Sequence, residues 1–175
     1  RLSGSITLNA TDGVLVAASS QLQGPALAVS TGSITIASRA AVSGAGDLVL
    51  GPGLQRTLAT IGEVYLQGRE GIRFVGDAQL NTRDLLELNT SQLSSSGGNA
   101  QLSANRVIFS NQLGDSGIAH SGDGSLSIAA QDLELLGDRS TPNATVGFDG
   151  FGRLELSASR AVYAAGQGVL ALGGA

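Results

Sequence analysis

The sequence GSITL at residues 4–8 returns almost unchanged as GSITI at residues 32–36. Each copy alternates an apolar residue, a threonine and a second apolar residue, which is the period of two expected for a β-strand. Short triplets of this kind recur along the chain between Gly, Ser, Asn and Asp residues, and a helical spacing of apolar residues is not sustained anywhere. The pattern predicts an all-β protein.

The apolar triplets recur at a nearly constant interval. Leu8, Val29 and Leu50 follow one another at equal steps along the chain, and Leu88 and Phe109 are separated by the same step. Because self-similarity at roughly 20 to 50 residues indicates a solenoid, we expect a right-handed parallel β-helix with coils of about 20 residues. The two copies of GSIT start at Gly4 and Gly32, which is more than one such step, so we expect them on different strands of neighbouring coils.

The alternation also predicts which side chains face the core. The outer residues of each triplet should stack on their equivalents in neighbouring coils, and the middle residues should face solvent. Only 3% of the residues are aromatic, so the core must be filled by Leu, Ile, Val and Ala. The expected solvent-facing residues are Thr7, Thr35, Arg73, Glu87, Ser127, Glu134 and Glu155.

Composition narrows the class of protein. There is no cysteine, which removes disulfides and thiolate metal sites, and the net charge of −4 argues against nucleic acid as a partner. No apolar run reaches the ~20 residues of a membrane-spanning helix, so we expect no membrane insertion. Because the chain starts without methionine or a signal region, residues 1–175 are interpreted as a single β-helix segment excised from a longer chain.

The segment 137–152 interrupts the repeat. It contains a proline, an asparagine and four glycines, so it is predicted to be a loop outside the β-helix. Exposed aromatic residues beside charged ones are typical of recognition surfaces, including those that stack on sugars. The candidate binding residues are therefore Arg139, Phe148, Asp149 and Phe151. The rings of Phe148 and Phe151 could instead fold back over the apolar flank of the expected β-helix.

A catalytic pair of carboxylates is the enzymatic alternative. Glu87, Glu134 and Glu155 each occupy the middle of an LEL triplet, and the last two are separated by one step of the repeat, which places them on adjacent or next-adjacent coils. Hydrolysis of glycosides requires two carboxylates about 5 to 9.5 Å apart. The favoured interpretation is that these acids are solvated residues of an outer strand face, and that the chain is not an enzyme.

The single histidine, His120, lies in a glycine-rich segment near Asp115 and Asp123. One histidine without cysteine does not make the usual zinc site, so no metal and no cofactor are predicted. The sequence GDGS at residues 122–125 resembles one fragment of calcium-binding repeats, but the tandem units that such repeats need are missing.

Several longer stretches resemble a known family. GSITLNA, GSITIAS, GSLSIAAQDLELLG and GRLELSASRAVYAAG are similar to the repeats of filamentous-haemagglutinin-like exoproteins, the secreted partners of bacterial two-partner secretion systems. The resemblance implies a β-helical shaft of an adhesin, secreted or on the surface of a Gram-negative bacterium. It also implies an outer-membrane transporter that acts on a region not present here, and attachment to host or neighbouring cells, with glycans among the candidate ligands.

Two alternatives to an adhesin shaft remain open at this point. The segment could be the stalk of a toxin-delivery or cell-surface signalling exoprotein, whose activity would depend on other residues. It could also be a carbohydrate-active β-helix enzyme, which would depend on the carboxylates described above.

Overall fold

The computed structural model describes residues 4–10, 22, 24–39, 47–137, 144–166 and 168–173. Strands dominate this part of the chain, and every strand pair in it is parallel. The prediction of an all-β protein is confirmed. The elements are β1 (Ile6–Asn9), β2 (Ala26–Ala37), β3 (Asp47–Leu50), α1 (Pro52–Leu58), β4 (Glu63–Val75), β5 (Gln79–Asn81), β6 (Leu85–Asn89), β7 (Gln92–Ser95), β8 (Asn99–Ser110), β9 (Gly124–Leu136), β10 (Ala144–Asp149), β11 (Phe151–Ala165) and β12 (Gly168–Leu172).

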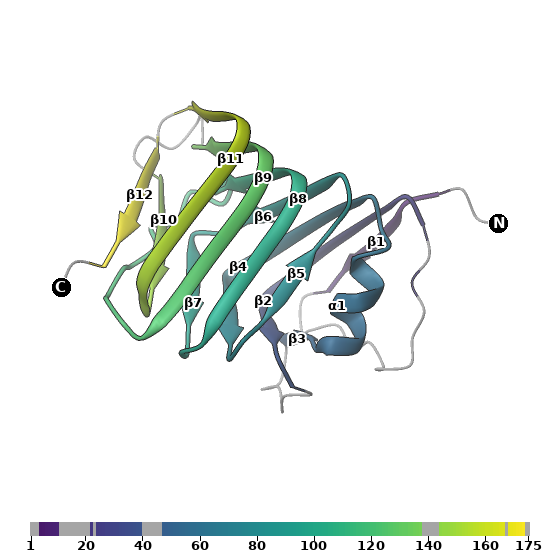
Figure 1. Ribbon diagram of the computed structural model, residues 1–175, viewed down its shortest axis with the longest axis horizontal. Coiled ribbons are helices and arrows are strands. Elements are labelled where there is room, and N and C mark those ends of the chain that lie inside the picture. Colours follow the sequence, from purple (N-terminus) through teal and green to yellow (C-terminus); the bar gives the residue numbers. More distant parts are fainter. Residues whose placement is uncertain are drawn as a thin grey trace.

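The strands form three rows around one core, and together they close almost into a barrel (Figure 1). Row A contains β1, the first part of β2 and β4, β6, and the second part of β8, β9 and β11. Row B contains β3, the second part of β2 and β4, β7, β10 and β12. Row C contains β5 and the first part of β8, β9 and β11. The long strands bend at a corner and belong to two rows.

Apolar side chains form continuous columns across the strands of each row. One column in row A runs through Leu27, Val64, Leu86, Val107 and Leu133, which are partners in register. All five side chains are almost fully buried. Because each strand supplies an apolar residue at the same height, burial and backbone pairing favour the same register.

The spacing of paired residues agrees with the sequence periodicity only in part. Leu8 pairs with Val29, and Leu88 pairs with Phe109, as their equal separations in the sequence predict. Leu50 does not continue the Leu8 column, since it pairs with Ile36 in row B. The repeated words do lie on different strands, because GSITL is in β1 of row A and GSITI is in the part of β2 that belongs to row B.

The sequence predicts a loop at 137–152, and this prediction is wrong for the residues of the segment that the structure describes. Ala144–Asp149 is strand β10, which pairs with β7 and β12, and Phe151 opens β11. Phe148 and Phe151 are buried in the core, where their rings pack edge to face with a centroid separation of 6.3 Å. Arg139 lies outside the described residues.

A close backbone contact at Gly147 explains a glycine that the sequence pattern assigns to a loop. Gly147 of β10 donates its N–H to the carbonyl oxygen of Ser91, and a β-carbon on Gly147 would overlap the backbone of Gly117 and Ile118. Residues 111–123, which link β8 to β9 without forming a strand, therefore pass directly against β10. Glycine is required here for close approach of two backbone segments, which the sequence alone does not distinguish from a turn.

The short helix α1 was not expected from the sequence. It packs beside β5 at the start of row C, with Leu54 and Leu58 buried (Figure 1). The side chain of Gln55 donates to the carbonyl oxygens of Ala37 and Leu50 at 2.7 and 2.6 Å, and accepts the N–H of Gln79 at 3.2 Å. One glutamine thus satisfies backbone groups that a neighbouring strand would otherwise pair.

The alternation of side chains holds, but an outward position is not always an exposed one. Thr7, Arg73 and Glu155 are exposed as predicted. Thr35 alternates with the core residues Ile34 and Ile36, yet it is only 4% exposed. The prediction that Thr35 faces solvent is therefore wrong.

Replacing Leu88 by Asp should lower the free energy of unfolding by about 3 to 5 kcal/mol, because an unpaired carboxylate would enter a fully buried column. Thr7→Asp is the exposed control and should change it by less than about 0.5 kcal/mol. Thr35→Asp should cost about 1 to 3 kcal/mol, although the sequence pattern alone ranks it as silent. Urea denaturation measures all three, and equal values for Leu88→Asp and Thr7→Asp would contradict the assigned core.

Replacing Gly147 by Ala should destabilise the protein by about 2 kcal/mol or more, because the added methyl group overlaps the segment that crosses β10. Gly4→Ala is the matched control, since a β-carbon there has nothing within 4 Å. Thermal unfolding followed by circular dichroism compares the two variants. An unchanged melting temperature for Gly147→Ala would show that this contact is not tight.

Candidate functional site

A cluster of charged side chains lies on the outer face of row A, across β8, β9 and β11. Arg106 of β8 is the register partner of Asp132 in β9, and Glu134 of β9 is the partner of Tyr163 in β11. These positions alternate with the core column that contains Leu133, so their side chains point away from the core. The cluster is completed by Arg160, and we call these five residues the row A cluster: Arg106, Asp132, Glu134, Arg160 and Tyr163.

A β-bulge positions Arg160. The pairing of β11 with β9 shifts between Ala158 and Ala161, so β11 contains one more residue than β9 at this corner. Bulges of this kind redirect a side chain that would otherwise follow the strand alternation. The Nε atom of Arg160 donates to Oδ1 of Asp132 at 2.7 Å, and Nη2 donates to Oδ2. The arginine and the carboxylate therefore form a two-point contact between neighbouring strands.

The second ion pair is diagonal. The Nε atom of Arg106 donates to Oε1 of Glu134 at 2.6 Å, and Nη2 contacts the same oxygen. Arg106 is nevertheless directly opposite Asp132 in register, so its charge also acts on that carboxylate. The hydrogen bond from Arg160, together with the charges of Arg160 and Arg106, lowers the pKa of Asp132 below its usual value.

The row A cluster surrounds a hollow with a volume of about 500 Å³, which Leu136 and Ala165 also line. The side chains of Asp132 and Glu134 are only 10% and 12% exposed, whereas those of Arg160 and Arg106 are 68% and 51% exposed. The carboxylates thus form the floor, and the arginines and the half-exposed Tyr163 form the rim. Both carboxylates are engaged by arginine, which makes them hydrogen-bond acceptors of fixed orientation.

The structure does not stack Glu134 and Glu155, the two carboxylates of the enzymatic alternative. Glu134 is in row A, whereas Glu155 is in row C, where it pairs with Ser127 and contacts Arg153 at 3.1 Å. Glu87 and Glu134 share a column but are separated by Ile108, which places their strands two spacings, or about 9.6 Å, apart. The corner between the rows separates residues that a constant interval in the sequence would stack.

The candidate binding residues of segment 137–152 do not form a common surface among the residues that the structure describes. With Phe148 and Phe151 in the core, the reason for proposing them as an exposed binding surface is removed. Asp149 instead accepts the backbone N–H of His120 at 2.9 Å, and its Oδ1 lies 2.8 Å from Nδ1 of the histidine ring. These contacts attach residues 111–123 to the end of β10. Asp115 and Asp123 are exposed, and the described residues contain no group of three possible metal ligands.

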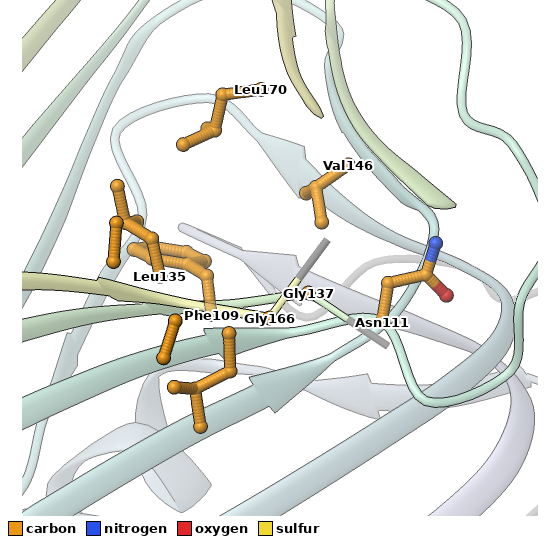
Figure 2. A pocket seen from close by; sticks show the side chains of 10 residues that line it. Phe109, Asn111, Leu135, Gly137, Val146, Gly166 and Leu170 are labelled. Carbon is orange, nitrogen blue, oxygen red and sulfur yellow. The ribbon is translucent and has the colours of Figure 1, made fainter. Parts of the chain in front are cut away.

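A small apolar cavity lies between rows A and B near the C-terminal end of the stack. Its volume is about 110 Å³, and Phe109, Leu135, Val146 and Leu170 line it, with Asn111 at its edge (Figure 2). The Oδ1 atom of Asn111 is the only buried side-chain polar atom without a partner among the described residues, while its Nδ2 donates to two backbone carbonyl groups. Apart from Asn111 the lining residues are apolar or glycine, and none of them is titratable.

Four members of the row A cluster were not selected from the sequence. Arg106, Asp132 and Arg160 stand just before an apolar triplet in three successive repeats, in the words NRVIF, QDLEL and SRAVY. A charge thus recurs where each strand enters row A, at equivalent positions for Arg106 and Asp132 and one residue earlier for Arg160, and this recurrence is the sequence signal for the cluster. Tyr163 gives no such signal because it is uncharged, although it occupies the outward position that pairs with Glu134.

Compared with known proteins, the chain matches no family model, no curated protein and no solved structure. Within the part of the chain that the structure describes, no helix is long and apolar enough to cross a membrane.

The lowered pKa of Asp132 predicts how its contribution to stability depends on pH. The ionised form is favoured in the folded protein, so its stabilisation is complete above the usual pKa of 3.8 and is lost as the pH falls below that value. The melting temperature of Asp132→Asn should therefore lie below that of the unchanged protein at neutral pH, and the difference should shrink between about pH 5 and pH 2. A difference that stays constant over this range would contradict the assigned ion pair.

Proposed function

We propose that this chain is a shaft segment of a large bacterial exoprotein of the filamentous-haemagglutinin-like, two-partner-secretion type, secreted or held at the surface of a Gram-negative cell. In this proposal the segment is a right-handed parallel β-helix that acts in attachment to host or neighbouring cells. The observation that carries the proposal is the stacking of parallel strands in three rows around continuous apolar columns.

The pairing intervals support the β-helix. In the main column of row A, Val64 pairs with Leu86 and Leu86 with Val107, and both intervals match a coil of about 20 residues that crosses three rows. The next two partners, Leu133 and Val162, follow at longer intervals, because the links before β9 and β10 contain additional residues. Parallel strands joined through a crossover are right-handed in nearly all proteins, which favours the proposed hand.

The last strands of the stack support an extended assembly. Val162 occupies an inward position in the core column but is 60% exposed, because β11 is the end strand of its row among the strands that the structure describes. The inward-facing Leu156, Leu170 and Leu172 are also exposed. Apolar side chains beside an unpaired strand edge form a surface that a further coil would cover in a fibre of stacked coils.

The partners follow from the same proposal. The outer-membrane transporter would act on a part of the exoprotein that is not in this chain, and the outer faces of the rows would meet the target cell. Nucleic acid is not proposed as a partner, because the net charge of −4 does not attract a polyanion. Absence of cysteine suits passage of an unfolded chain through a pore, since no disulfide can form on the way.

Antibodies raised against this chain should detect a polypeptide many times heavier than 17.5 kDa in the culture medium or at the surface of the producing cells. The expected result follows from a shaft built of many coils, and immunoblots of medium, surface and cytoplasmic fractions measure it. A band near the mass of this chain inside the cell would contradict the proposal.

A further inference from the structure

The row A cluster offers hydrogen-bond donors, acceptors and an aromatic ring in one surface hollow, and we propose that it binds a neutral glycan. The inference rests on the proposed function, because it names the ligand class through which this part of the shaft would attach. In the bound state the guanidinium groups of Arg106 and Arg160 donate to sugar oxygens, the floor carboxylates accept from sugar hydroxyl groups, and the ring of Tyr163 packs against a sugar face.

The guanidinium groups are held in place before any ligand arrives. Each one directs Nε and Nη2 to a carboxylate, and among the described residues Nη1 of neither arginine has a partner. A side chain fixed by one ion pair loses less conformational freedom when it binds a second acceptor. A hydroxyl-rich ligand suits this arrangement, because each sugar hydroxyl both donates and accepts a hydrogen bond.

Tyr163 gives the hollow an apolar platform. It lies on β11, the last strand of row A, is 52% exposed, and is close enough for its phenol to affect the pKa of Arg160. An aromatic ring with a polar tip is suited to a ligand that has an apolar face and a hydroxyl edge. Tyr163 takes part in neither ion pair, so its ring is not needed to hold the two arginines.

Charge decides between neutral and acidic glycans. Arg106 and Arg160 are balanced by Asp132 and Glu134, so the row A cluster has no net charge, and the whole chain is at −4. A sulfated or otherwise polyanionic glycan would meet two largely buried carboxylates without an excess of positive charge. The arrangement therefore favours neutral sugars of the hexose or N-acetylhexosamine type.

A second tyrosine provides a matched control. Tyr65 belongs to the same outward column as Tyr163 but lies four strands away, at about 19 Å, and its hydroxyl group donates to Glu63. Its replacement removes the same chemical group from the same outer face without touching the hollow.

The test uses the 175-residue chain on a panel of immobilised neutral oligosaccharides of hexose and N-acetylhexosamine, with heparin as the sulfated comparison. At least one neutral oligosaccharide should bind, and its Kd is then measured in solution by calorimetry. Tyr163→Ala and Arg160→Lys should each raise that Kd at least about tenfold. The first removes the ring, and in the second lysine retains the charge but not the planar guanidinium group. Tyr65→Ala should leave the Kd unchanged, and circular dichroism confirms that each variant is folded.

The proposal is overturned if no neutral oligosaccharide binds, if heparin alone binds, or if Tyr163→Ala leaves the Kd unchanged. It is also overturned if Tyr65→Ala weakens binding as much as Tyr163→Ala. These outcomes are independent of where the exoprotein is found in the producing cell. If the protein is found at the cell surface but binds no glycan, only this inference is contradicted. If it is a 17.5-kDa intracellular protein that does bind a glycan, only the proposed shaft function is contradicted.

Discussion

Parallel backbone pairing between successive strands is the interaction on which the rest of this structure depends. It holds equivalent residues at the same height in every strand of a row, so that the aliphatic side chains of Leu86, Val107 and Leu133 pack against one another on neighbouring strands. The core is therefore a set of aliphatic columns, and few rings are needed to fill it. A shift by one residue would move every column to the outside, which is why burial and pairing act together to fix the register.

The same pairing orders the outer face of row A. Arg106 meets Asp132, and Glu134 meets Tyr163, because the strands that carry them are in register. The exception is Arg160, which reaches Asp132 from a bulge at the corner between rows C and A. One additional residue at a corner thus converts a repeated strand surface into a hollow with largely buried carboxylates and exposed guanidinium groups.

Close backbone contacts set a second constraint, on glycine. Gly147 allows residues 111–123 to pass against β10, and the side-chain amide of Gln92 bonds both backbone groups of Ile118. Because those residues do not form a strand, β10 pairs directly with β7. Row B is consequently built from segments that lie far apart in sequence, whereas row A follows the chain coil by coil.

The sequence by itself determined the all-β class, the inward and outward alternation of most triplets, and the partners of Leu8 and Leu88. These are local properties, since a period of two and a regular interval between triplets can be counted along the chain. The burial of Thr35, Phe148 and Phe151, the separation of Glu134 from Glu155, and the cluster around Asp132 were decided only by the tertiary structure. The rows of Glu134 and Glu155 and the position of Arg160 depend on where the chain turns a corner, and the burial of Phe148 depends on packing between distant segments, neither of which a local pattern records.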